Sequence, residues 1–184
     1  NECFFRKSIN LRWAESGSAM IKGRHFKKEI VFFPYLASMW DCLEGIWQSM
    51  VRDGESCLVS VVPIPYMELN SDGTVRAWHC DASKFPSYVP VVDWHTYDLA
   101  AHRPDIIFIH NPYDGINLVS RVASQYYAAE LKKYTSLLVY VPYFVSGPHV
   151  DPVFCRLPGV LYADRVIVES ENIKQQYEQN YPGG

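Results

Sequence analysis

The feature that most constrains the fold is the segment over residues 103–112, RPDIIFIHNP. It places four large apolar residues, three of them isoleucine, between a Pro-Asp entry and a His-Asn-Pro exit. A continuous apolar run of this kind is typical of a strand buried on both faces, as in the parallel sheet of an α/β domain. Burial of each such side chain contributes roughly 1.5–3 kcal/mol, so we expect this strand at the centre of the sheet.

Similar apolar runs recur along the chain and alternate with amphipathic stretches. This alternation predicts the α/β class, with a Rossmann-like, doubly wound, mainly parallel sheet and helices on both faces. We expect a helix after residue 38 with Ser38 as its cap, and further helices over 120–134 and 171–180. The remaining expectations are parallel strands near 30–35, 57–63, 105–110, 137–143 and 165–169, a short strand over 88–92, a helical turn over 94–102, and a hairpin whose second arm covers 74–80.

Size and composition suit one ordinary globular domain. The chain has 184 residues, of which 48% are hydrophobic and 20% charged. A net charge of −3 without a basic run argues against nucleic acid as a partner. Five scattered cysteines favour reduced thiols and a cytoplasmic location. No stretch of about 18 apolar residues is present that would predict a membrane span.

The chain divides into two unequal parts. Residues 1–28 carry mixed charge and little periodicity, and we interpret them as a preceding linker or cover segment. Residues 29–184 form the predicted Rossmann-like domain. The chain starts with Asn and ends in Pro-Gly-Gly, so we expect it to be part of a longer protein.

Polar side chains follow the predicted central strand. In open α/β sheets the ligand crevice lies beyond the carboxyl ends of the strands, where His110, Asn111 and Asp114 fall. His110 can act as a general base because its ordinary pKa lies near neutral pH, with Asp114 as the nearest carboxylate to orient it. The structural alternative is a histidine that braces the turn, with both ring nitrogens bonded to the backbone. The predicted site therefore has His110 and Asp114 as catalytic residues and Asn111, Tyr143, Ser146, Ser38 and Trp40 as substrate contacts.

Two further polar residues, His79 and Asp81, lie on the predicted hairpin arm. They either overhang the same crevice or are simply solvated, and the solvated interpretation is favoured. No phosphate-binding glycine loop, nucleophile elbow or zinc-protease motif is found, so the sequence predicts neither a cofactor nor a metal bound by this chain.

Several segments together resemble a family. Over about residues 29–181 this chain resembles the N-terminal domain of CDP-glycerol:poly(glycerophosphate) glycerophosphotransferase-like proteins. The segments that carry the resemblance are VFFPYLASMWDCLEGIW, VVPIPY, RPDIIFIHNPYD, LKKYTSLLVYVPYF and ADRVIVESENIKQQY. That family is similar to two-domain glycosyltransferases of the GT-B type. The resemblance implies a missing C-terminal half that holds a CDP-glycerol-like donor, and an acceptor side formed by this chain.

The function implied is that of a transferase in the synthesis of a teichoic-acid-like cell-envelope polymer. It implies a polymer or small-molecule acceptor and a cytoplasmic place, with peripheral association at the inner face of the membrane left open. Better-known members carry a Trp-His-Gly-Thr-Pro loop where this chain has Pro142, Tyr143 and Phe144. This departure supports an alternative, a non-catalytic Rossmann-like interaction or ligand-binding domain. Either way, residues 1–184 alone are expected to be inactive, because the orientation of two bound reactants supplies roughly 7–11 kcal/mol of barrier lowering.

Overall fold

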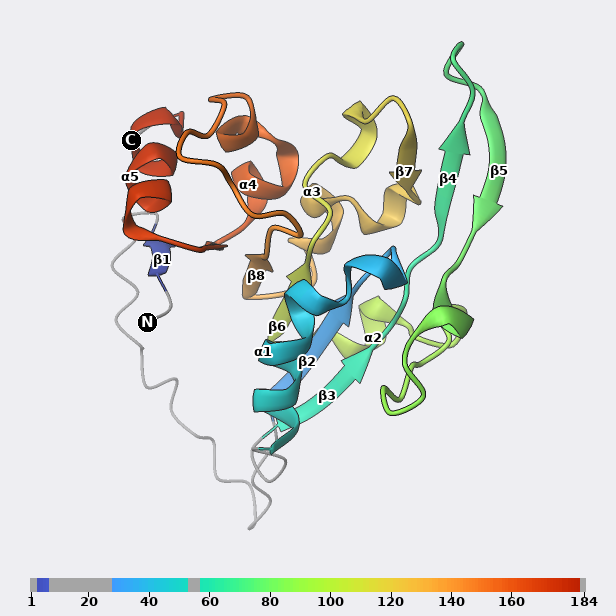
Figure 1. Ribbon diagram of the computed structural model, residues 1–184. Coiled ribbons are helices and arrows are strands. Elements are labelled where there is room, and N and C mark those ends of the chain that lie inside the picture. The colour runs from blue at the N-terminus through green and yellow to red at the C-terminus, as the bar shows by residue number, and fades with distance from the viewer. Residues whose placement is uncertain (1–2, 7–27, 53–56, 183–184) are drawn as a thin grey trace.

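The computed structural model describes residues 3–6, 28–52 and 57–182, and the rest of the predicted linker over 7–27 lies outside the described residues. The main sheet has the strand order β1-β9-β8-β6-β2-β3 (Figure 1). All neighbours are parallel except β1, which is antiparallel to β9. The predicted mainly parallel α/β fold is confirmed. The strands are β1 (Cys3–Arg6), β2 (Lys28–Phe33), β3 (Cys57–Val61), β6 (Ile106–Ile109), β8 (Leu137–Tyr140) and β9 (Arg165–Val168).

Strand β6 occupies the interior position that its apolar run predicted. It pairs with β2 on one side and β8 on the other, so that Ile106 lies opposite both Ile30 and Leu137. Phe108 stacks on Phe32 of β2 with ring centroids 4.6 Å apart. β1 was not predicted, because its sequence, Cys-Phe-Phe-Arg, is too short an apolar run to be distinguished from a linker.

Helices cover both faces of the main sheet. Alternate strand residues point to opposite sides, which divides the interior into two hydrophobic clusters. One cluster packs under α1 (Asp41–Arg52), which lies against β2 and β3 in Figure 1. The other packs under four shorter helices: α2 (Leu99–His102), α3 (Ala128–Leu131), α4 (Pro158–Tyr162) and α5 (Glu171–Asn180).

A second, antiparallel sheet stands beside the main one, at the right of Figure 1. It has the order β5-β4-β7, with β4 (Tyr66–Leu69), β5 (Val75–His79) and β7 (Ser120–Val122). The β4–β5 pair confirms the predicted hairpin. Gly73, with φ of 83°, supplies the left-handed residue of its turn.

The expected helix over 120–134 is wrong in its first half. Residues Ser120–Val122 pair with β4, and only Ala128–Leu131 is α-helical. The buried Val122 and Tyr126 are four residues apart, which imitates helical periodicity, although Val122 belongs to β7 and Tyr126 to a 3-10 turn. The predicted strand over 88–92 is a single bridge between Val61 and Val91, and only Leu99–His102 of the 94–102 turn is helical.

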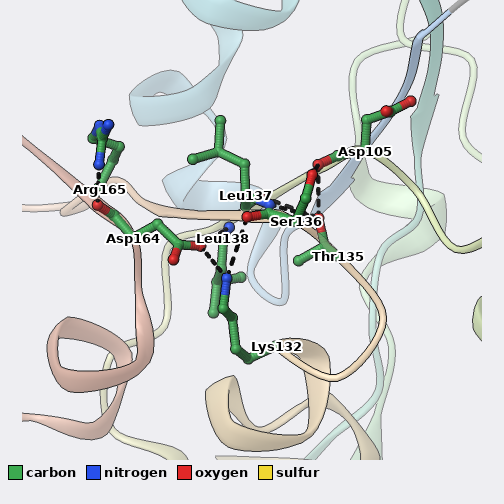
Figure 2. A network of polar contacts seen from close by, with 8 residues as sticks. All are labelled: Asp105, Lys132, Thr135, Ser136, Leu137, Leu138, Asp164 and Arg165. Carbon is green, nitrogen blue, oxygen red and sulfur yellow. Dashed lines mark hydrogen bonds and ion pairs between the residues drawn. The ribbon is translucent and has the colours of Figure 1, made fainter. Parts of the chain in front are cut away.

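The amino ends of β6, β8 and β9 are tied by a polar network (Figure 2). The Asp164 carboxylate accepts hydrogen bonds from the Leu138 N–H at 2.7 Å and from Lys132 Nζ at 2.5 Å. The backbone oxygen of Asp105 accepts from the hydroxyls of Thr135 and Ser136. These contacts hold the amino ends of the three strands together. The candidate site lies at the opposite, carboxyl edge of the sheet.

Candidate functional site

The loops after β2, β6 and β8 meet at the carboxyl edge of the main sheet. His110 follows β6 directly, and its ring lies edge-on to two tyrosines from the neighbouring loops. The ring centroids are 5.1 Å apart for Tyr35, after β2, and 6.2 Å apart for Tyr143, after β8. The predicted convergence of these loops is therefore present in the structure.

His110 is completely buried beneath these loops. Its Nε2 accepts a hydrogen bond from the backbone N–H of Tyr35 at 3.0 Å, and its Nδ1 lies 3.5 Å from Cys42 Sγ. The backbone of Met39 forms a further hydrogen bond with the ring. Because Nε2 acts as an acceptor, the neutral imidazole carries its proton on Nδ1.

Burial sets the protonation of this pair. It lowers the pKa of His110 to about 4, against a smaller opposing effect of the Met39 hydrogen bond, and raises the pKa of the Cys42 thiol to about 12. Both groups are thus neutral near pH 7, and Cys42 is not an activated thiolate. The ring is closed to solvent and is not oriented by Asp114, which is the arrangement expected of the structural alternative.

Asp114 is also buried, and it supports a neighbouring helix. Both carboxylate oxygens lie 3.0 Å from the backbone N of Ala128, the first residue of α3. Asp114 adopts a left-handed φ of 47°, which aspartate tolerates better than most residues. Burial raises its pKa to about 6, and the Ala128 hydrogen bond opposes that rise. The carboxylate is positioned to hold α3 against the loop.

The 110–114 loop is packed too closely on α4 to admit a ligand from that side. The N–H of Gly159 donates to the oxygen of Pro112 at 2.8 Å. A Cβ on Gly159 would lie only 2.6 Å from Pro112 Cα. Asn111 is buried as well, and its side-chain oxygen lies 3.4 Å from the Tyr113 N–H. These contacts make the loop a rigid support.

The corner after β2 contributes packing. Trp40 is buried among Phe32, Trp47 and Phe85. Ser38 is exposed in the 3-10 turn η1 (Ala37–Met39), and α1 begins only at Asp41, so the expected cap by Ser38 is wrong.

Asp81 is buried, so the expectation that it would be solvated is wrong. Its carboxylate accepts from the Ala37 N–H at 3.2 Å, the Tyr66 hydroxyl at 3.3 Å and Lys84 Nζ at 2.7 Å. Asp81 thereby ties the hairpin to the corner after β2. His79, by contrast, has an exposed side chain, as expected.

Two of the predicted site residues line an open hollow. This carboxyl-edge groove follows β8, has a volume of about 350 Å³, and contains Tyr143 and Ser146. The other predicted residues (His110, Asn111, Asp114, Ser38 and Trp40) are absent from its lining. The complete lining is Tyr113, Tyr143, Phe144, Val145, Ser146, Gly147, His149, Val150, Asp151 and Phe154.

Helix α5 holds the outer wall of this groove in place. Asn172 and Gln176 both donate to the oxygen of Pro148, at 3.1 and 3.0 Å. The Gln176 oxygen in turn accepts from the Val150 N–H at 2.7 Å. On the inner wall the hydroxyls of Tyr143 and Tyr113 are 3.3 Å apart. The groove therefore has fixed walls and presents a pair of hydroxyls.

The chemistry available in the carboxyl-edge groove is hydrogen bonding and proton transfer. His149 and Asp151 are exposed titratable side chains in its lining, on the segment that the sequence places after the β8 strand. Desolvation raises the pKa of Tyr143, so its hydroxyl stays protonated. Among the described residues, no three His, Cys, Asp or Glu side chains gather as a metal site would require.

No family model, curated protein or solved structure matches this chain. In the part of the chain that the structure describes, none of the helices has the length and apolar character needed to cross a membrane.

Proposed function

We propose that this chain is the acceptor-side half of a glycerophosphotransferase-like enzyme that acts on a cell-envelope polymer. The observation that carries the proposal is the carboxyl-edge groove, at the place where parallel α/β sheets bind ligands. Two of the motifs that resemble the glycerophosphotransferase-like family contribute to its lining, through Tyr113 and through Tyr143 and Phe144. The donor, a CDP-glycerol-like nucleotide, would be held by a second half, as in two-domain transferases.

In this proposal the groove binds the terminal hydroxyls of the acceptor. Phe144 and Phe154, whose ring centroids are 5.6 Å apart, give an apolar wall for the carbon skeleton. The Tyr113 and Tyr143 hydroxyls give hydrogen bonds to the acceptor oxygens. No Lys or Arg is among the described residues that line the groove, so the polymer's phosphates would lie outside it.

The reaction would join an acceptor hydroxyl to the glycerophosphoryl group of the donor and release CMP. A base must take the proton of the attacking hydroxyl. His149 and Asp151 are the exposed candidates in this half, whereas buried His110 and Asp114 act as positioning residues in the loop below. General-base catalysis contributes typically about 10²–10⁴-fold, which sets the scale of the loss on removing such a group.

The test is CDP-glycerol turnover by the longer protein that contains this chain, with an oligomeric glycerophosphate acceptor. The expected results are turnover by the longer protein, none by residues 1–184 alone, and a loss of roughly 10²-fold or more for one of His149→Ala and Asp151→Ala. Tyr162→Ala, an exposed aromatic residue outside the groove, is the control. Turnover by residues 1–184 alone would contradict the proposal, and so would full activity in the double variant.

A second candidate is a non-catalytic Rossmann-like ligand-binding domain. It is favoured by the burial of His110 and by Pro142-Tyr143-Phe144, which stand where better-known glycerophosphotransferases carry a histidine. The two functions differ in one measurable respect. Binding of glycerol or glycerophosphate in the groove without any turnover by the longer protein would favour the binding domain.

A further inference from the structure

A second hollow shares no residue with the carboxyl-edge groove. This aromatic groove, of about 490 Å³, is bounded by the end of β5, the exit of β3, the turn at residues 94–95 and the residues that follow β7. A binding pocket of ordinary size has about 300–1,000 Å³. Its lining is Pro65, Trp78, His79, Cys80, Trp94, His95, Ala123 and Gln125.

Aromatic side chains from two separate segments line the aromatic groove, and Trp94 is partly buried against the core. Trp78 lies on β5 and is 57% exposed, although an indole is costly to leave in water. Trp94 stacks on His95 with ring centroids 3.7 Å apart and an interplanar angle of 30°. Aromatic rings that remain accessible in a groove favour ligands that also have an apolar flat face.

Hydrogen-bonding groups stand between these rings. His79 binds Glu68 through Nε2 at 3.4 Å, and His95 binds Asp93 through Nδ1 at 2.8 Å. Each carboxylate takes one ring nitrogen, so that the second nitrogen is the one a ligand would meet. Gln125 adds an amide, which can both donate and accept.

The aromatic groove continues into an adjoining hollow of about 420 Å³ that shares Trp94, His95 and Gln125 with it. Asp98 and Glu130 belong to this second hollow. Together the two hollows have room for a ligand longer than a single ring.

Charge narrows the class of ligand. None of the described residues that line either hollow is Lys or Arg, so neither offers a cation for a phosphate or carboxylate. The nearby acids are already bonded: Glu68 to His79, Asp93 to His95, Asp98 to the N–H groups of Ala100 and Ala101, and Glu130 to Lys133. These four carboxylates are therefore not available to surround a cationic ligand. The complementary ligand is uncharged, with a C–H face for the indoles and hydroxyls for the polar groups.

We propose that the aromatic groove and its adjoining hollow bind an uncharged oligosaccharide, with sugar rings on the faces of Trp78 and Trp94. This site is separate from the carboxyl-edge groove and does not depend on the proposed transferase function. It would anchor the protein to a glycan while the carboxyl-edge groove remains free.

The experiment is an NMR titration of ¹⁵N-labelled chain with three uncharged tetrasaccharides in turn: maltotetraose, cellotetraose and tetra-N-acetylchitotetraose. We expect at least one tetrasaccharide to shift the indole N–H signals of Trp78 and Trp94 and to leave those of buried Trp40 and Trp47 in place. Trp78→Ala should weaken that binding roughly tenfold, whereas Trp78→Phe, which keeps a ring face, should stay within about threefold. Trp78 is exposed on an edge strand, so these variants are expected to fold.

Tyr162→Ala, which removes an exposed ring from α4, is the matched control and should bind as the wild type does. The proposal is overturned if no tetrasaccharide shifts the Trp78 and Trp94 signals, or if Trp78→Ala leaves the affinity unchanged. It is overturned as well if choline or CMP, tested in the same way, shifts these signals at lower concentration than every sugar does.

Discussion

His110→Ala is expected to destabilise the fold strongly at neutral pH. The substitution removes the acceptor for the buried Tyr35 N–H and the contacts of the ring with the Met39 backbone and with Cys42 of α1. An unsatisfied buried N–H costs about 1–3 kcal/mol, and a cavity left by a fully buried ring adds to that. We therefore expect the free energy of unfolding to fall by about 3–5 kcal/mol.

The size of this loss should depend on pH. The pKa of His110 is about 4 in the folded chain, below its ordinary value of 6.5. As the pH falls, the unfolded chain takes up the proton first, so the stability present above about pH 6.5 is lost progressively toward pH 4. The alanine variant has no group at position 110 that takes up a proton, so its stability does not change with pH for this reason. The stability gap between wild type and His110→Ala should hence shrink by about 2–3 kcal/mol between about pH 7 and about pH 4.5.

Urea unfolding followed by tryptophan fluorescence at the two pH values measures both quantities. His95→Ala, which removes an exposed histidine, is the control and should change stability by less than about 1 kcal/mol at either pH. A His110→Ala protein with wild-type stability at neutral pH would refute the structural role. A stability gap that does not change with pH would refute the burial of a neutral ring.

Three further changes test other parts of the fold, each by urea unfolding. The pKa of Asp114 is raised to about 6 in the folded chain, so the wild type loses stability as the pH rises through that value. The free energy of unfolding of Asp114→Asn should therefore increase relative to that of the wild type by about 2 kcal/mol between about pH 4 and pH 7. A difference that stays constant with pH would contradict this. Gly159→Ala should cost about 1–3 kcal/mol, since its Cβ meets the backbone of Pro112, whereas Gly45→Ala in α1, which meets nothing within 4 Å, should not destabilise. Asp164→Ala should cost about 1–3 kcal/mol because the Leu138 N–H loses its acceptor, and Lys132→Met should cost less; the reverse order would show that the ion pair carries the energy.

The strands of the main sheet could be predicted because their signal is local. Each is a short apolar run that has no stable place except between two layers, and Ile106–Ile109 is the clearest case. The hairpin of β4 and β5 was predictable for a similar reason, since the Asn-Ser-Asp-Gly turn sets its geometry within a few residues. Parallel order then fixes which loops share the carboxyl edge.

The tertiary structure alone decided which of the edge residues are open to a ligand. His110 and Tyr143 both follow buried strands, yet one is sealed beneath the Tyr35 loop and the other lines a groove. Asp81 was expected to be solvated and is instead buried by contacts with Ala37 and Tyr66, far away in sequence. Burial depends on partners that a local pattern does not contain.

The same limit explains β7 and the aromatic groove. Residues Ser120–Val122 become a strand because β4 offers them an open edge, and the apolar spacing of the segment by itself favoured a helix. Trp78 and Trp94 attracted no functional prediction because they lie on separate segments that only the packing of β5 against the 94–95 turn brings together. The sequence by itself thus determined the layers and the edge of the sheet, where short-range patterns suffice. The positions of open and closed side chains were decided by long-range contacts, because exposure is a property of the assembled surface.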